Sequence, residues 1–74
     1  MEKLLEILGK IKPDVDFKTA ENLIEDGILD SFDIVTLVAQ ISDEFDVEIS
    51  VKDIIPENFY SAETIYKLIE ESED

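Results

Sequence analysis

The sequence predicts an all-α domain, a small four-helix bundle of three main helices and one short helix, with a long loop between the first two helices. Three segments repeat apolar residues at the spacing of a helical stripe. The one possible strand, at 46–49, has no second strand to pair with. The 74 residues are 45% hydrophobic, which is enough to fill the core of a single domain spanning 1–74.

The first helix is expected over residues 1–11, where an apolar stripe is formed by Leu4, Leu5, Leu8 and Ile11. Pro13 should end it, because a proline disfavours the α conformation in the residue before it. Residues 12–30 then form a connection that is long for a compact domain unless its own side chains pack. Within it, Thr19 could cap one helical turn over 19–24. The expected anchors of the connection are Val15, Phe17, Leu23, Ile24, Ile28 and Leu29.

The second helix is expected over residues 31–45. Gly27 can adopt a positive φ and so suits the bend that precedes it. Ser31 has the chemistry of an N-cap, since its hydroxyl can accept a hydrogen bond from an N–H two or three residues later. Asp30 and Asp33 place negative charge beside the positive end of the helix. The core stripe of this helix is expected to be Ile34, Leu37, Val38, Ile41 and Phe45.

Three apolar residues of the second helix, Phe32, Val35 and Ala39, lie toward a different face from this stripe. Phe32 and Val35 could complete a wide core stripe. Alternatively, all three residues form a patch on which a partner docks, with Asp33 as an accompanying charge. Helical spacing alone leaves both interpretations open.

The last third of the chain should contain one short helix and one full helix. Val51–Ile55 is expected to form a short helical turn that Pro56 stops. Ser61 is expected to cap the last helix, whose core face is Ile65, Leu68 and Ile69.

The charge of the chain restricts its partners. Twenty acidic residues against six lysines give a net charge of -14, which repels nucleic acid and anionic membranes and favours partners with basic surfaces. No stretch approaches the roughly 18 apolar residues of a membrane span, and the N-terminus lacks the apolar core of a signal peptide. We therefore expect a cytoplasmic monomer.

The sequence offers little chemistry of its own. Ser31 has no histidine to activate it, because the chain contains none, and the Gly-x-Ser-x-Gly elbow is missing. Taken alone, Ser31 is most simply an N-cap. Acid-rich stretches starting at Asp14 and Asp46 fail as EF-hand loops, since Thr19 and Val51 stand where glycine is needed. We expect no catalytic residue, no metal site and no enzymatic activity.

The stretch Gly27-x-x-Asp30-Ser31, followed by Phe32 and Asp33, resembles the attachment motif of acyl carrier proteins. In that family the serine carries 4′-phosphopantetheine as a phosphodiester. The resemblance therefore implies that Ser31 binds this cofactor covalently, with Asp30 as the acid before it. A serine at a helix start would also place the phosphate near free N–H groups and the positive end of the helix dipole.

Two later stretches, 45–49 and 54–61 together with Ile65, also resemble acyl carrier proteins, so the resemblance covers nearly the whole chain. It implies a carrier that holds an acyl or aminoacyl group as a thioester on the arm. Such a carrier delivers the group to partner enzymes of fatty acid, polyketide or related biosynthesis. The implied partners are a phosphopantetheinyl transferase and acyl-transferring or acyl-activating enzymes with basic surfaces.

Two alternatives stay open. Phe32 stands where leucine is usual in fatty-acid carriers, and Thr36 and Ser42 stand where acids are frequent. The Asp-Ser-Phe sequence is similar to D-alanyl carrier proteins, so the chain could carry D-alanine or another amino acid. From a different class, it could be an unmodified acidic helical interaction module in which Ser31 is only a cap.

Overall fold

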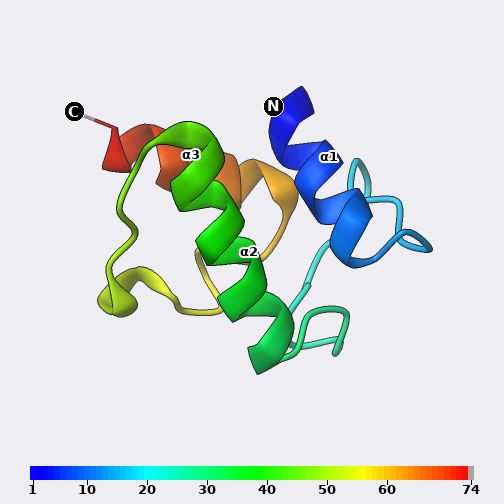
Figure 1. Ribbon diagram of the computed structural model, residues 1–74. Coiled ribbons are helices and arrows are strands. Elements are labelled where there is room, and N and C mark those ends of the chain that lie inside the picture. Colours follow the sequence, from blue (N-terminus) through cyan, green and yellow to red (C-terminus); the bar gives the residue numbers. More distant parts are fainter. Residues whose placement is uncertain (74) are drawn as a thin grey trace.

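The computed structural model describes Met1–Glu73, and within that range it is all-helical and has no strands (Figure 1). Three α-helices, α1 (Glu2–Ile11), α2 (Ser31–Phe45) and α3 (Ala62–Ser72), are joined by loops, one of which contains the 3₁₀-helix η1 (Val51–Asp53). The Cα radius of gyration is 11.0 Å, close to the roughly 11 Å of a folded domain of this length. The all-α prediction is confirmed. The predicted domain extends to Asp74, which lies outside the described residues.

Helix α1 begins one residue later than predicted and ends at the predicted residue. The N–H of Lys12 donates to the Leu8 carbonyl over 2.9 Å and closes the last turn. The buried face consists of Leu4, Ile7 and Leu8, so Ile7 belongs to the core although the predicted stripe omitted it. Leu5 is only partly buried at the edge of that face.

Helix α2 has the predicted bounds but a different cap. Asp30 is the N-cap: its Oδ1 accepts a hydrogen bond from the Asp33 N–H over 2.8 Å, and Asp33 Oδ2 accepts one from the Asp30 N–H over 3.3 Å. Ser31 is the first residue inside the helix, so the prediction that Ser31 is the N-cap is wrong by one position. Asp30 is the cap because Asp33, three residues later, supplies a carboxylate that completes a capping box with it.

The connection over residues 12–30 is fixed to the rest of the domain by buried apolar side chains and by backbone hydrogen bonds. Phe17, Leu23 and Leu29 are buried. The Leu23 N–H donates to the Tyr60 carbonyl over 3.1 Å, and the Leu29 N–H donates to the Leu23 carbonyl over 2.8 Å. The connection therefore packs as part of the domain, as its length required.

The helical turn proposed over residues 19–24 is not present, so that prediction is wrong. The chain forms turns there, Asn22 adopts the left-handed conformation with φ 53°, and the Thr19 hydroxyl donates to the Asp16 carbonyl over 3.4 Å. Gly27 does take a positive φ, 74°, at the bend before α2, as its lack of a Cβ allows.

The short helix predicted at Val51–Ile55 is a three-residue 3₁₀-helix, Val51–Asp53. The prediction of a four-helix bundle therefore stays a prediction in its detail. Ser61 caps α3 as predicted: its Oγ accepts a hydrogen bond from the Thr64 N–H over 3.4 Å, and Thr64 Oγ1 accepts one from the Ser61 N–H over 3.0 Å.

The core lies between the three α-helices and the folded loops. Helices α1 and α2 run antiparallel beside each other (Figure 1), with Lys3 Nζ lying 3.6 Å from Glu44 Oε2 at one end of the pair. Each buried residue in the described range is hydrophobic; the fully buried large ones are Phe59, Leu4, Leu8, Leu23, Leu29, Leu37, Ile41, Ile65 and Ile69. Within residues 1–73, no helix is both long and apolar enough to cross a membrane.

Candidate functional site

Ser31 lies exposed at the start of α2, on the end of the helix reached by the bend at Gly27 (Figure 1). The first N–H groups of a helix have no acceptor within it. In α2, the Asp33 N–H is satisfied by Asp30 Oδ1 and the Ile34 N–H by the Asp30 carbonyl. The N–H groups of Ser31 and Phe32 precede these. An anionic group attached to the Ser31 hydroxyl would therefore lie next to two backbone donors and the positive end of the helix dipole.

The carboxylate of Asp33 lies on the opposite side of this first turn and is held by two donors. It accepts the Asp30 N–H, and its Oδ2 lies 3.2 Å from Lys12 Nζ. Partial desolvation works to raise the pKa of Asp33, but the hydrogen bonds from Asp30 and Lys12 and the positive charge of Lys12 outweigh it. The pKa of this carboxyl consequently lies below its ordinary value, and Asp33 is ionised at neutral pH.

The exposed apolar residues of α2 continue from Ser31 along one side of the helix. Val35 and Ala39 follow Ser31 at intervals of four residues, which places all three on one face, and Phe32 lies beside Ser31. We call these four residues the Ser31 face. Phe32 is 79% exposed, Val35 is 68% exposed and Ala39 is also exposed. The interpretation of Phe32 and Val35 as part of a wide core stripe is therefore wrong.

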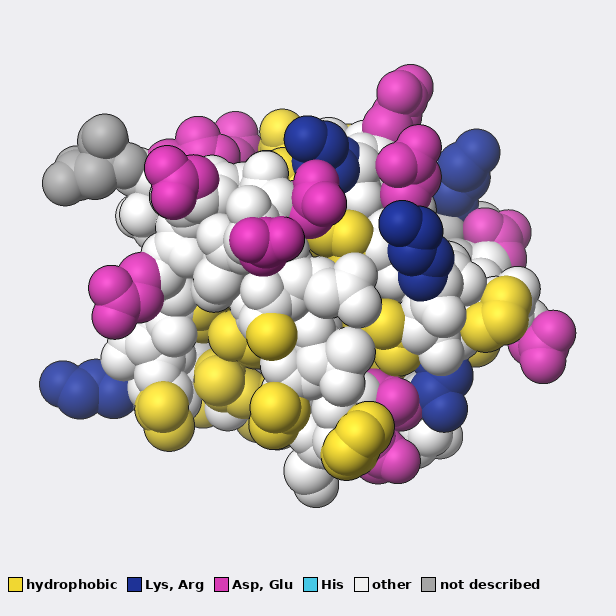
Figure 2. Space-filling model, in the orientation of Figure 1, with side chains coloured by type: hydrophobic (Ala, Val, Ile, Leu, Met, Phe, Trp, Pro, Cys, Tyr) yellow, Lys and Arg dark blue, Asp and Glu magenta, His cyan; other side chains and the backbone are white. Residues whose placement is uncertain are grey.

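Further apolar side chains are exposed in the loop after α2. Val51 in η1 is 83% exposed, and Ile55 just beyond it is also exposed. In Figure 2 hydrophobic side chains gather in the lower half of the view, where Figure 1 shows the N-terminal half of α2 and the loop with η1. Sequence reasoning predicted a short helical turn at Val51–Ile55 but made no prediction that these side chains are exposed.

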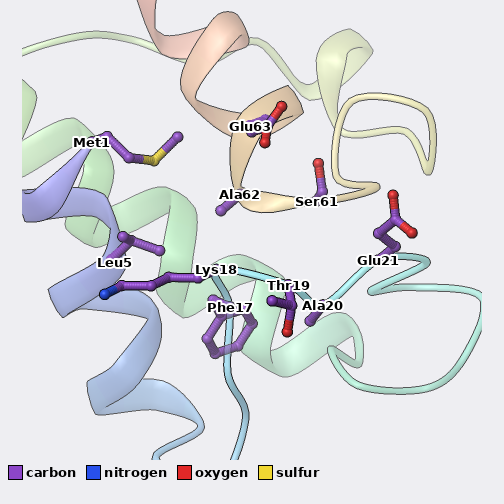
Figure 3. Close-up of a pocket in the computed structure, with 10 residues that line it drawn as sticks. All are labelled: Met1, Leu5, Phe17, Lys18, Thr19, Ala20, Glu21, Ser61, Ala62 and Glu63. Carbon is purple, nitrogen blue, oxygen red and sulfur yellow. The ribbon is translucent and has the colours of Figure 1, made fainter.

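Hollows in the surface lie away from Ser31. One of about 230 Å³ is formed by the start of α1, the connection and the start of α3, and its lining residues are Met1, Leu5, Phe17, Lys18, Thr19, Ala20, Glu21, Ser61, Ala62 and Glu63 (Figure 3). Another, of about 300 Å³, lies between α3 and the loop before it. No residue of α2 lines either hollow. Ser31 therefore lies outside both hollows, on the exposed start of α2.

Lys12 is a residue of this site that sequence reasoning missed. It follows directly after α1, nineteen positions before Ser31 in the chain, and the fold brings its ammonium group to Asp33. The pattern of apolar residues placed Lys12 only at the start of the connection over residues 12–30. No signal in a single sequence could have paired it with the start of α2.

Comparisons with known proteins found a matching family model and curated relatives. A family model described as "Phosphopantetheine attachment site" matches residues 1–71. Curated relatives include the D-alanyl carrier proteins of Bacillus cereus (strain B4264) and Bacillus anthracis (strain CDC 684 / NRRL 3495). The chain is 30% identical to each over 76 residues, which covers 95% of this chain and 91% of each relative.

Proposed function

This chain belongs to the phosphopantetheine attachment-site family, whose prosthetic group is 4′-phosphopantetheine, and we propose that Ser31 is the residue that carries it. The observation behind this proposal is the exposed Ser31 hydroxyl at the first position of α2, beside the N–H groups of Ser31 and Phe32. The site fits a phosphodiester because backbone donors and the helix dipole stabilise an anion there.

Attachment is a phosphoryl transfer from coenzyme A. The Ser31 oxygen attacks the phosphorus that bears the pantetheine arm, the pyrophosphate bond of coenzyme A breaks, and adenosine 3′,5′-bisphosphate leaves. A base of the phosphopantetheinyl transferase takes the hydroxyl proton, since the chain has no histidine or cysteine and Ser31 lies outside the hollows described above. Once attached, the arm supplies a thiol that holds an acyl or aminoacyl group as a thioester.

We infer that the protein is a carrier without catalytic activity of its own, and that its cargo is a small aminoacyl group. Carrier proteins of its family transport substrates, and the relatives reported above are named D-alanyl carrier proteins. Phe32 directly after Ser31 is the residue that pointed to this class from the sequence. A fatty acyl or polyketide cargo is the alternative. A monomeric state and a cytoplasmic location stay predictions.

The Ser31 face is the surface we propose for partner docking, with Asp33 as a flanking charge. Its apolar residues are exposed beside the attachment serine. The net charge of -14 favours a partner with an apolar centre and a basic rim, because complementary charges steer the encounter. The expected partners are the phosphopantetheinyl transferase and the acyl-activating or acyl-transferring enzymes.

Attachment is tested by incubation with coenzyme A and a broad-specificity phosphopantetheinyl transferase, followed by intact-mass measurement. The wild type should gain the mass of one arm. Ser31→Ala should gain none, whereas Ser42→Ala, which removes a serine from the other end of α2, should be modified like the wild type. An unmodified wild type would favour the acidic interaction module, and a modified Ser31→Ala would place the arm elsewhere.

The cargo is tested on the arm-bearing protein. A D-alanine-activating ligase with ATP and D-alanine should load one aminoacyl group, which hydroxylamine then releases as expected for a thioester. Fatty-acyl transferases serve as the comparison. Loading by these transferases alone would overturn the aminoacyl assignment and leave the attachment at Ser31 intact.

A further inference from the structure

Lys12 forms an ion pair with the carboxylate of Asp33, which lies two residues after the proposed attachment serine. The Lys12 ammonium lies 3.2 Å from Asp33 Oδ2, and the Asp33 side chain is only 15% exposed, whereas the Lys12 side chain is 39% exposed. The Asp33 charge that a basic partner would meet is therefore already paired with a cation of the same chain.

The charges are distributed unevenly along the chain. Residues 1–18 contain four lysines and four acidic residues, so the whole net charge of -14 falls on residues 19–74. Lys12 brings a cation from the neutral segment to the start of α2, where Asp30 and Asp33 lie. Its ammonium thus lowers the negative potential at the place where the Ser31 face begins.

We propose that Lys12 is an internal competitor of the basic partner: it holds Asp33 in the free protein and yields it to a partner cation on docking. This inference rests on the function proposed above. Release of the ammonium is easy because an ion pair that water can reach contributes little to stability. The Lys12 side chain can also rotate away from Asp33 and become solvated, since it is already partly exposed. Lys12 therefore limits how fast basic partners engage Ser31 and selects partners whose own cation can replace it.

The test compares two lysines that each pair with an acidic residue of α2, at opposite ends of that helix. Lys12→Met removes the charge beside Asp33 and keeps an apolar side chain. Lys3→Met, the matched control, removes the same charge from the Lys3–Glu44 pair at the far end of the helix. Lys12→Arg keeps the pair. Each variant is checked by circular dichroism, and Lys12→Gln replaces Lys12→Met if the latter does not fold.

The measured quantity is kcat/KM of arm attachment from coenzyme A by the transferase at low ionic strength. Lys12→Met should react about two- to five-fold faster than the wild type, since a unit charge acting through water over about 10 Å changes encounter roughly two-fold and the freed Asp33 adds to it. Lys3→Met and Lys12→Arg should stay near the wild-type rate. The gain of Lys12→Met should shrink at high salt.

Repeating the measurement in a variant that lacks the Asp33 charge tests whether Lys12 acts through Asp33. In Asp33→Asn, whose amide oxygen can still accept the Asp30 N–H, Lys12→Met should give much less acceleration. A Lys12→Met variant that reacts no faster than the wild type, or no faster than Lys3→Met, would overturn the proposal and leave a purely structural pair. A wild type that accepts no arm would instead remove the proposed function itself, so the two failures are distinct.

Discussion

The two carboxylates at the start of α2 have separate tasks. Asp30 accepts the Asp33 N–H and thereby begins the helix, while Asp33 returns a hydrogen bond to the Asp30 N–H and pairs with Lys12. Ser31, between them, uses its backbone for the helix and leaves its hydroxyl exposed. A serine that capped the helix would have its hydroxyl engaged in a hydrogen bond, so the cap at Asp30 keeps the Ser31 oxygen available for chemistry.

This division predicts effects of different size on stability for substitutions of the two neighbouring residues. Asp30→Ala should lower the free energy of unfolding by about 0.5–2 kcal/mol through loss of the cap, whereas Ser31→Ala should change it by less than about 0.5 kcal/mol. Urea unfolding followed by circular dichroism measures both. Asp30→Asn, which keeps a capping oxygen, is the control and should stay near the wild type. A larger loss for Ser31→Ala than for Asp30→Ala would contradict the observed cap.

The ion pair of Asp33 predicts a dependence on pH. Because the pKa of Asp33 is lowered in the folded protein, its stabilisation is fully present above the unfolded value of about 3.9 and is lost as the pH falls through the folded pKa. The difference in unfolding free energy between the wild type and Asp33→Asn should therefore be constant above about pH 5 and shrink below about pH 4. The same difference should be smaller in a Lys12→Met background. A difference that grows on acidification would contradict the sign.

At the scale of the element, α2 separates core from surface within single turns. Val35→Lys should leave the helical circular dichroism intact, because its side chain is 68% exposed, and should slow arm attachment or cargo loading by disturbing the Ser31 face. Leu37→Ala should cost about 2–5 kcal/mol, since Leu37 is fully buried. If Val35→Lys unfolds the domain, the residue is core; if it alters no partner reaction, docking lies elsewhere.

The helices were largely predictable from the sequence, because their apolar spacing and stop signals are local. Residues 31–45 were predicted at their observed bounds, and Ser61 was predicted as the cap of α3. The cap of α2 was missed by one residue, since aspartate and serine are both good N-caps. The backbone shows that Asp30 lies outside the helix and that Ser31 is its first residue. The reciprocal carboxylate at Asp33 was the available signal.

The candidate site was predictable only in part, because some of its contacts join segments that are distant in the sequence. Ser31, Asp30 and the apolar residues of the Ser31 face are consecutive or nearly so, and a helix fixes their mutual arrangement. Lys12 reaches Asp33 only through the folded connection, and Val51 became exposed because η1 is too short to present a core face. Contacts between distant segments depend on packing that no local pattern encodes.

For the whole molecule, the net charge of -14 should limit stability through self-repulsion. The melting temperature should rise with sodium chloride, which screens the charges, and further with millimolar magnesium or calcium at equal ionic strength, which also bind carboxylates. Comparing the salts at matched ionic strength separates screening from binding. A melting temperature indifferent to all three salts would show that repulsion is unimportant here.

The hydrogen bond from the Leu23 N–H to the Tyr60 carbonyl has a consequence for local opening. Leu23 is fully buried, so its amide proton should exchange with deuterated water almost as slowly as that of Leu37. The exposed Lys18 amide, bonded only to the nearby Asp16 carboxylate, should exchange far faster. Equal rates for Leu23 and Lys18 would mean that the connection opens by itself. Slow exchange at Leu23 would instead place the connection and the start of α3 in one cooperative unit, which opens only when the whole domain does.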